Sequence, residues 1–183
     1  MDQIKQAVDA WLALAKHIIP EDDVRLQFIQ WLMAAIDRDA PAPKQILVLR
    51  ARQGVGKTLL MSPFISAGIA VRRECYDWLN VGLQGVTPSP LPPLAVIDEL
   101  DTRSRVSMDL TTLWASQHGG RAIALSNHVE LSGEPLDATG VYGAYDSRAE
   151  PLAPTFYADY LESLKAAKGN EKEILAGIKA SLN

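Results

Sequence analysis

Cysteine is almost absent from this sequence of 183 residues, because Cys75 is the only one. One cysteine excludes an internal disulfide framework and a cysteine-based metal cluster. No apolar run is long enough to span a membrane, and the first residues mix acidic and apolar side chains, unlike a signal peptide. We therefore expect a protein of the cytoplasm, bacterial or of a host cell, that works without a membrane.

The chain also lacks an excess of positive charge. Its 18 Lys and Arg residues are outnumbered by 22 Asp and Glu, which gives a formal net charge of −4. An acidic surface repels DNA and RNA at long range, so the overall charge does not indicate nucleic-acid binding, although a local basic patch or pore stays open. The apolar share of 48% is ordinary for a globular protein, and the length suits one α/β domain with a core.

Short apolar runs alternate with helical patterns through the middle of the chain. Continuous apolar runs are typical of strands buried on both faces of a parallel sheet. The expected strands are 45–49, 68–71, 94–97 and 122–125. The expected helices between them are 58–65 and 108–117. Prolines in 87–93, and Gly, Asp and Pro in 132–150, predict loops there.

Both ends of the chain have the spacing of apolar residues that is typical of amphipathic helices. Two helices are expected before residue 37, separated at Pro20, and two more at 155–168 and 171–182. The sequence thus predicts an α/β fold, with a mainly parallel sheet flanked by helices. We expect three parts: a helical segment at 1–43, a core at 44–150, and C-terminal helices at 151–183 that pack on the core.

A glycine-bearing loop follows the first expected strand. Its small residues would let backbone N–H groups wrap closely around phosphate oxygens. Lys57 would contact the β- and γ-phosphates, and Thr58 would offer its hydroxyl to Mg²⁺. The strict pattern begins with glycine where this chain has Ala51, so a chance glycine-rich turn is the alternative. The residues expected to bind a nucleoside triphosphate such as ATP are Gln53, Gly54, Val55, Gly56, Lys57, Thr58 and Leu59.

Polar side chains end two later strands. Asp98 follows the third expected strand, where a carboxylate can hold the Mg²⁺ shell, and the adjacent Glu99 can polarise an attacking water. Asn127 ends the fourth strand, where its amide could orient that water or touch the γ-phosphate. A helix N-cap at Asp98 and a turn-forming Asn127 are the alternatives. Ligands of such sheets gather at the carboxyl ends of strands, which favours the catalytic interpretation.

Together the segments 48–58, 96–99 and 125–128 resemble the three signature motifs of superfamily 3 helicases. The nearest resemblance is to the ATPase domain of phage, plasmid and poxvirus-type primase–helicases, and it covers roughly residues 11–164. It implies a phosphate-loop NTPase with an AAA+-like core and Mg²⁺-dependent ATP hydrolysis. It also implies a homo-oligomeric ring, possibly a hexamer, that moves on single-stranded DNA during replication beside proteins such as a primase.

The same resemblance gives candidates for an arginine finger, the arginine that one subunit offers to the γ-phosphate on its neighbour. Residues 146–148 are similar to the family's later Asp-Arg-Arg-type segment, so Arg148 is the first candidate and a solvated loop arginine is the alternative. Arg103 and Arg105 are further candidates. Arg72 and Arg73 are expected at the surface, with a contact to DNA or to another subunit as the alternative.

The chain departs from this family between its second and third motifs. Only 28 positions separate Glu99 from Asn127, an interval where the family places a helix and a DNA-contacting hairpin. His118 and Arg121 are the polar residues that a shortened hairpin would keep. A motor ATPase resembling a helicase is therefore the first hypothesis, and a nucleotide-dependent regulatory or assembly ATPase that does not unwind DNA is the second. A small-molecule phosphotransferase is disfavoured by Glu99, because a kinase must exclude water.

Overall fold

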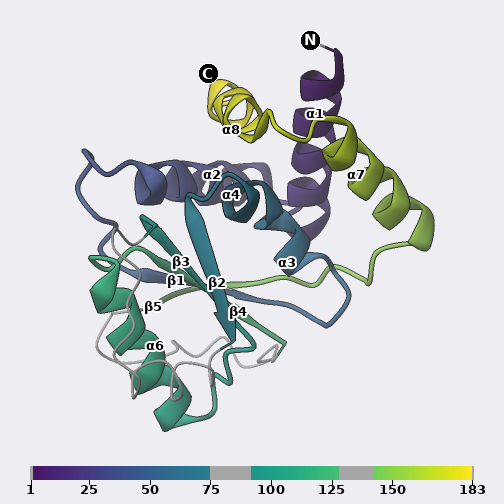
Figure 1. Cartoon of the computed structure of the whole chain (residues 1–183). Helices are drawn as coiled ribbons and strands as arrows, with labels where there is room; N and C mark the ends of the chain where they lie inside the picture. Colours follow the sequence, from purple (N-terminus) through teal and green to yellow (C-terminus); the bar gives the residue numbers. More distant parts are fainter. Residues whose placement is uncertain (1, 75–91, 128–141, 183) are drawn as a thin grey trace.

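The computed structural model describes residues 2–74, 92–127 and 142–182 (Figure 1). Within them, five parallel strands form one sheet in the order β2-β3-β4-β1-β5. The strands are β1 (Ile46–Arg50), β2 (Ala70–Glu74), β3 (Leu94–Asp98), β4 (Ala122–Ser126) and β5 (Tyr142–Asp146). The predicted α/β fold with a parallel sheet flanked by helices is confirmed.

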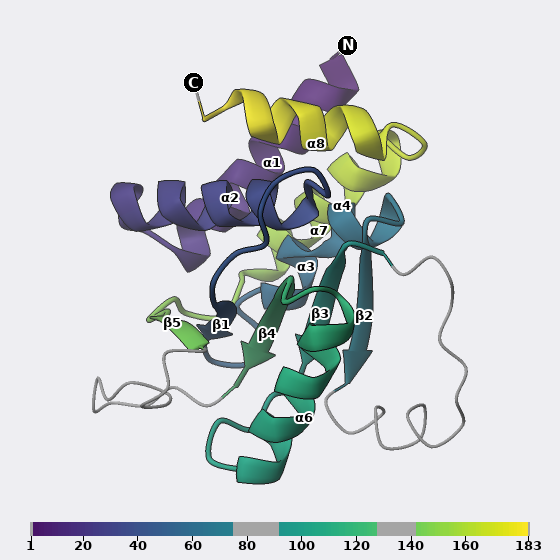
Figure 2. The same ribbon diagram turned by 90° about the vertical axis from the view of Figure 1, so that its left-hand side faces the viewer.

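Helices cover the two faces of this sheet unequally. The helices are α1 (Asp2–Ile18), α2 (Asp22–Ile36), α3 (Lys57–Leu60), α4 (Ser62–Ser66), α6 (Arg105–Gln117), α7 (Pro154–Ala166) and α8 (Glu171–Ala180). Among the described elements, α6 lies alone on one face, and the others lie on the opposite face (Figures 1 and 2). Both chain ends are on that second side (Figure 2).

Strand alternation explains how one short sheet serves two apolar cores. In β3, Leu94 and Val96 belong to the core shared with the terminal helices, whereas Ala95 and Ile97 belong to the core beneath α6. All five β3 residues are buried. Successive side chains of a strand point to opposite faces, so a strand covered on both faces needs a continuous apolar run. This is why β3 and β4 could be predicted from their apolar runs.

The short helix α3 is held by side chains from both ends of the chain. The buried indole of Trp11, on α1, donates a hydrogen bond of 2.8 Å to the carbonyl of Leu60. The hydroxyl of Tyr160, on α7, donates one of 2.9 Å to the carbonyl of Leu59. Carbonyls in the last turn of a helix lack intrahelical partners, so these two donors satisfy groups that would otherwise be left unpaired. The terminal helices therefore fix the helix that follows the glycine-bearing loop.

Four sequence predictions need correction. Residues 142–146, expected in a loop, form the edge strand β5. The helix expected at 58–65 is divided at Met61, whose backbone N–H bonds back to Thr58 instead of continuing one helix. The helix expected at 108–117 begins at Arg105, because Ser104 caps it by accepting a hydrogen bond from the backbone of Ser107. The strand expected at 68–71 is displaced to β2. Residues 87–91 and 132–141 of the expected loops lie outside the described part.

No helix within the described residues is long and apolar enough to cross a membrane.

Candidate nucleotide site

The predicted phosphate-loop residues and two of the strand ends meet around one cavity of about 500 Å³. It lies at the carboxyl edge of the sheet, where β1, β4 and β3 are neighbours. The lining residues are Gln53, Gly54, Gly56, Lys57, Thr58, Leu59, Arg72, Asp98, Glu99, Asn127, Leu152, Pro154 and Tyr157. Of the residues predicted from the sequence to bind nucleotide, Val55 alone does not line it, since its side chain is buried.

The glycine-bearing loop has a backbone that glycine makes possible. Gly54 and Gly56 have φ angles of +85° and +96°, in the left-handed region that other residues rarely adopt. A Cβ atom on Gly56 would also lie 2.8 Å from Leu152 and 2.9 Å from Leu14. The backbone N–H of Leu152 donates a 3.0 Å hydrogen bond to the carbonyl of Gly54. The loop is thus shaped from within and packed from outside by residues far along the chain.

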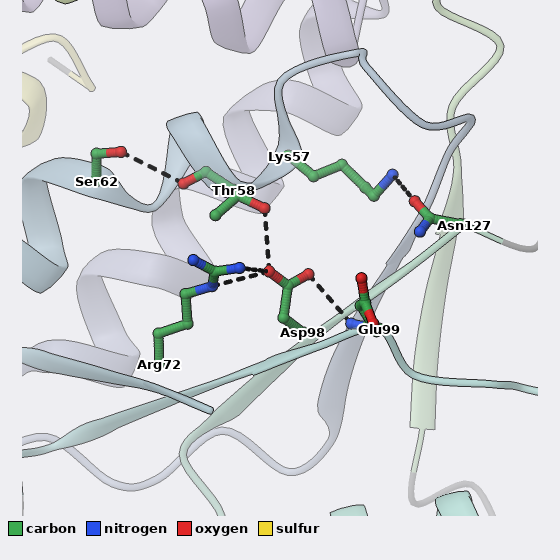
Figure 3. A network of polar contacts seen from close by, with 7 residues as sticks. All are labelled: Lys57, Thr58, Ser62, Arg72, Asp98, Glu99 and Asn127. Carbon is green, nitrogen blue, oxygen red and sulfur yellow. Dashed lines mark hydrogen bonds and ion pairs between the residues drawn. The ribbon is translucent and has the colours of Figure 1, made fainter. Parts of the chain in front are cut away.

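Lys57 is the buried cation of this cavity. Its ammonium group donates to the carbonyls of Ala51 at 2.8 Å and Arg52 at 3.0 Å. It also donates to the Asn127 side-chain oxygen at 2.9 Å (Figure 3). Burial lowers the pKa of Lys57 to about 8, and the nearby Asp98 carboxylate opposes that shift. An anion beside Lys57 would therefore be favoured, because it would compensate a charge that is now only hydrogen-bonded.

Asp98 collects the polar contacts on the other side of the cavity. Its carboxylate is almost buried, and one oxygen, Oδ2, accepts hydrogen bonds from the Thr58 hydroxyl at 3.2 Å and from Arg72 Nε at 2.8 Å (Figure 3). A second guanidinium nitrogen of Arg72 lies 2.6 Å from the same oxygen. The other oxygen accepts from the backbone N–H of Glu99 at 3.1 Å. Arg72 is exposed, as expected, and it also lines the cavity, which no sequence motif indicated.

Glu99 has a strained backbone. Its φ angle is +58°, the only positive value among the described residues other than glycine. Strain of this kind costs about 1–3 kcal/mol and collects at functional sites. The Leu100 backbone N–H is held by the carbonyl of Leu125, so the turn is fixed immediately beyond Glu99. This turn leaves the Glu99 carboxylate exposed at the cavity, between Asp98 and Asn127 (Figure 3).

Asn127 faces the cavity from the end of β4, as expected. Lys57 has only donors to offer, so the amide oxygen of Asn127 must point toward it, and the amide nitrogen is directed elsewhere. The side chain is therefore oriented by Lys57. Its N–H groups are the donors that a phosphate oxygen or a water molecule in the cavity would meet.

The residues present fit a hydrated Mg²⁺ ion held together with a nucleotide. The Thr58 hydroxyl and the Asp98 carboxylate are oxygen ligands on the same side of the cavity, 3.2 Å apart. Magnesium is commonly held by one or two carboxylates, substrate phosphates and water, not by an all-protein cage. The described residues include no group of three or more His, Cys, Asp or Glu side chains that could hold a metal ion.

The apolar wall of the cavity was not anticipated from the sequence. Leu152, Pro154 and Tyr157 follow β5 and line the cavity beside the glycine-bearing loop. Tyr157 is 46% exposed, a high value for a large aromatic residue. The three residues follow a segment that was expected to form a loop, and no sequence motif marked them as part of the site.

The candidate finger arginines lie outside the cavity of their own chain. Arg148 is exposed, just after β5, and does not line it. The preceding residues have structural contacts: the Asp146 carboxylate pairs with the buried guanidinium of Arg50, and Ser147 donates a 2.6 Å hydrogen bond to the carbonyl of Ile18. The exposed Arg103 and Arg105 pair with acidic residues close in sequence, Asp101 and Asp109. A finger role for any of them stays a prediction.

The interval between Glu99 and Asn127 contains α6, a tight turn and β4. It contains no hairpin, and every residue in it is described. His118 is buried, and its Nδ1 lies 2.8 Å from the carbonyl of Pro92. Arg121 donates to the carbonyl of Ala40 at 2.6 Å, tying the turn to the linker before β1. The expectation that these two residues form a polar hairpin tip is therefore wrong.

Comparison of the sequence with models of protein families found no matching family, and comparison with curated proteins found no similar protein. Functional inference therefore rests on the geometry of the cavity.

Proposed function

We propose that the chain is a Mg²⁺-dependent ATPase with a catalytic site of the superfamily 3 helicase type, on an AAA+-like phosphate-loop core. The observation that carries this proposal is the convergence of Lys57, Thr58, Asp98, Glu99 and Asn127 on one cavity from three adjacent parallel strands. A buried lysine, a glycine-shaped loop, a carboxylate beside a hydroxyl and an exposed second carboxylate are the groups that triphosphate hydrolysis requires.

Each group has a distinct part in this mechanism. Thr58 and Asp98 would hold Mg²⁺, which would supply positive charge to the phosphate oxygens. The Lys57 ammonium exchanges its carbonyl partners for phosphate oxygens and neutralises developing charge. The Glu99 carboxylate accepts a proton from the attacking water, and the Asn127 amide donates to that water or to the γ-phosphate.

Replacing Glu99 with Gln tests the hydrolytic role. We expect E99Q to bind ATP as the unaltered protein does and to lose about 100-fold or more of its kcat, the usual contribution of a general base. Glu74→Gln is the matched control, since Glu74 ends the neighbouring strand β2 with an exposed side chain that does not line the cavity. Phosphate release and binding of a fluorescent ATP analogue are measured separately. Unchanged turnover in E99Q would refute the assigned role, and absence of binding in the unaltered protein would refute the proposal.

Coupling of hydrolysis to movement on DNA is the first form of the proposal, a motor in a phage, plasmid or satellite replication system that works in the cytoplasm. One observation favours the second form, a regulatory or assembly ATPase. Residues 100–127 include no hairpin that could reach DNA, and the side chain of His118 in the turn is buried, with its Nδ1 beside the carbonyl of Pro92. The effect of single-stranded DNA on ATP hydrolysis distinguishes the motor from the assembly ATPase. Stimulated ATP hydrolysis supports the motor, and an unchanged rate without DNA binding supports the assembly ATPase.

A further inference from the structure

Arg72 lies where the proposed metal site needs a cation. It belongs to β2, the strand at the edge of the sheet, and the parallel register places it opposite Val96, two positions before Asp98. From there its guanidinium reaches forward to Asp98. Nε and a second nitrogen lie 2.8 and 2.6 Å from Oδ2, the oxygen that also accepts the Thr58 hydroxyl (Figure 3). Arg72 therefore occupies the face of Asp98 that is shared with the second proposed metal ligand.

Charge balance explains this contact. Asp98 is only 7% exposed, and a carboxylate so deeply buried requires a compensating charge. Lys57 directs its ammonium hydrogens to the carbonyls of Ala51 and Arg52 and to Asn127. Arg72 is consequently the cation that contacts Asp98 directly. Its own side chain is 45% exposed, so solvent can take up its guanidinium when the contact with Asp98 breaks.

Two cations beside one carboxylate oxygen repel each other strongly at such short separations. We propose that Arg72 is an exchangeable counter-ion of Asp98, bound in the absence of nucleotide and released when a Mg²⁺–nucleotide complex binds. This inference rests on the proposed function, because it takes Thr58 and Asp98 as the metal ligands. It makes Arg72 a positioning residue: part of the binding free energy of the metal complex is used to break the Arg72–Asp98 pair.

The consequence is a measurable difference between binding with and without metal. The dissociation constant of a fluorescent ADP analogue is determined in EDTA and in Mg²⁺. The value in EDTA divided by the value in Mg²⁺ gives the affinity gained through the metal. In Arg72→Gln the metal no longer competes with a guanidinium, so we expect this ratio to rise about fivefold, the effect of one partly exposed ion pair. Arg73→Gln is the matched control: the neighbouring residue does not line the cavity, and its ratio should stay unchanged.

A structural role alone would change both dissociation constants together and leave the ratio unchanged, and that result would overturn the inference. Arg72→Lys retains the charge with a single donor group and should give an intermediate ratio, which keeps the test available if R72Q folds poorly. Thermal unfolding shows whether R72Q has lost stability. If the unaltered protein binds the analogue without any gain from Mg²⁺, the proposed function fails, and not only the inference about Arg72.

The arginine itself provides a second readout. Its Nε–H resonance in an NMR spectrum, assigned by its loss in R72K, should shift when ADP is added with Mg²⁺ and stay in place when ADP is added with EDTA. A resonance that does not respond to the metal complex would mean that the pair with Asp98 persists, and the inference would be wrong.

Discussion

Tyr157 is an exposed aromatic side chain that lines the cavity proposed to bind phosphate. With Leu152 and Pro154 it gives the cavity an apolar wall beside the glycine-bearing loop. Phosphates cannot use such a wall, whereas a nucleobase can stack on it. This division of the cavity suits a nucleoside triphosphate better than an inorganic anion.

Replacing Tyr157 with Ala should therefore weaken ATP binding by about fivefold to a hundredfold, the range for loss of one base–aromatic contact. Tyr157→Phe, which keeps the ring, should bind normally. Inorganic tripolyphosphate is the informative competitor, since its affinity should be the same in Y157A and in the unaltered protein. Titration calorimetry with both ligands checks this. Equal weakening of ATP and tripolyphosphate would mean that Tyr157 supports the phosphate loop and not the base.

At the scale of single elements, β5 depends on an ion pair. The Arg50 side chain at the end of β1 is 2% exposed and pairs with Asp146 at the end of β5, with one N–O separation of 2.6 Å. Asp146→Asn would remove the carboxylate charge from this pair and should lower the free energy of unfolding by about 3 kcal/mol. Chemical denaturation measures this loss. Glu150→Gln, which removes the exposed partner of Arg52, should cost less than about 1 kcal/mol, and equal losses in the two variants would contradict the prediction.

The turn after α6 should be sensitive to pH. Burial lowers the pKa of His118 below its usual 6.5, and the contact with the Pro92 carbonyl opposes this only in part. The unfolded chain then binds a proton more readily than the folded one. Stability is complete above about pH 6.5 and is lost as the pH falls through the lowered folded value. From pH 7 to 5 the free energy of unfolding should fall less steeply in His118→Gln than in the unaltered protein. The two slopes should differ by at most about 1.4 kcal/mol per pH unit. Parallel slopes would exclude this residue as the cause.

The elements that could be predicted from the sequence are those with a simple burial pattern. β3 and β4 are buried on both faces, so their residues form continuous apolar runs. The edge strands have no such pattern, because β2 carries charge at Arg72, Arg73 and Glu74, and β5 contains glycine. The phosphate loop, Asp98, Glu99 and Asn127 follow local motifs and were therefore predictable. Arg72 and Tyr157 reach the cavity through tertiary packing, which no local pattern encodes.

For the whole molecule, the ring implied by the resemblance requires that one subunit complete the site of the next. Arg148 is exposed and does not line the cavity of its own chain, as such an arrangement demands. Lys57→Ala and Arg148→Ala should each abolish hydrolysis alone, whereas their mixture should recover about a quarter of the activity, the share of interfaces that unite an intact Lys57 with an intact Arg148.

Arg103→Ala is the control. Arg103 pairs with Asp101, and R103A should hydrolyse ATP without being mixed with another variant. Size-exclusion chromatography with a non-hydrolysable ATP analogue establishes whether rings form. If rings form and the mixture stays inactive, Arg148 is not the finger. If the protein stays monomeric while hydrolysing ATP, the ring itself is refuted.

The two side-chain hydrogen bonds to α3 connect the loop before it with the terminal helices. Trp11 of α1 and Tyr160 of α7 donate to consecutive carbonyls of α3, the helix that follows the glycine-bearing loop. A ligand that immobilises the loop would also suppress local opening of both terminal helices. Amide hydrogen exchange in α1 should slow when nucleotide binds, although no residue of α1 lines the cavity. Helix α1 would then report the occupancy of a cavity that none of its residues lines.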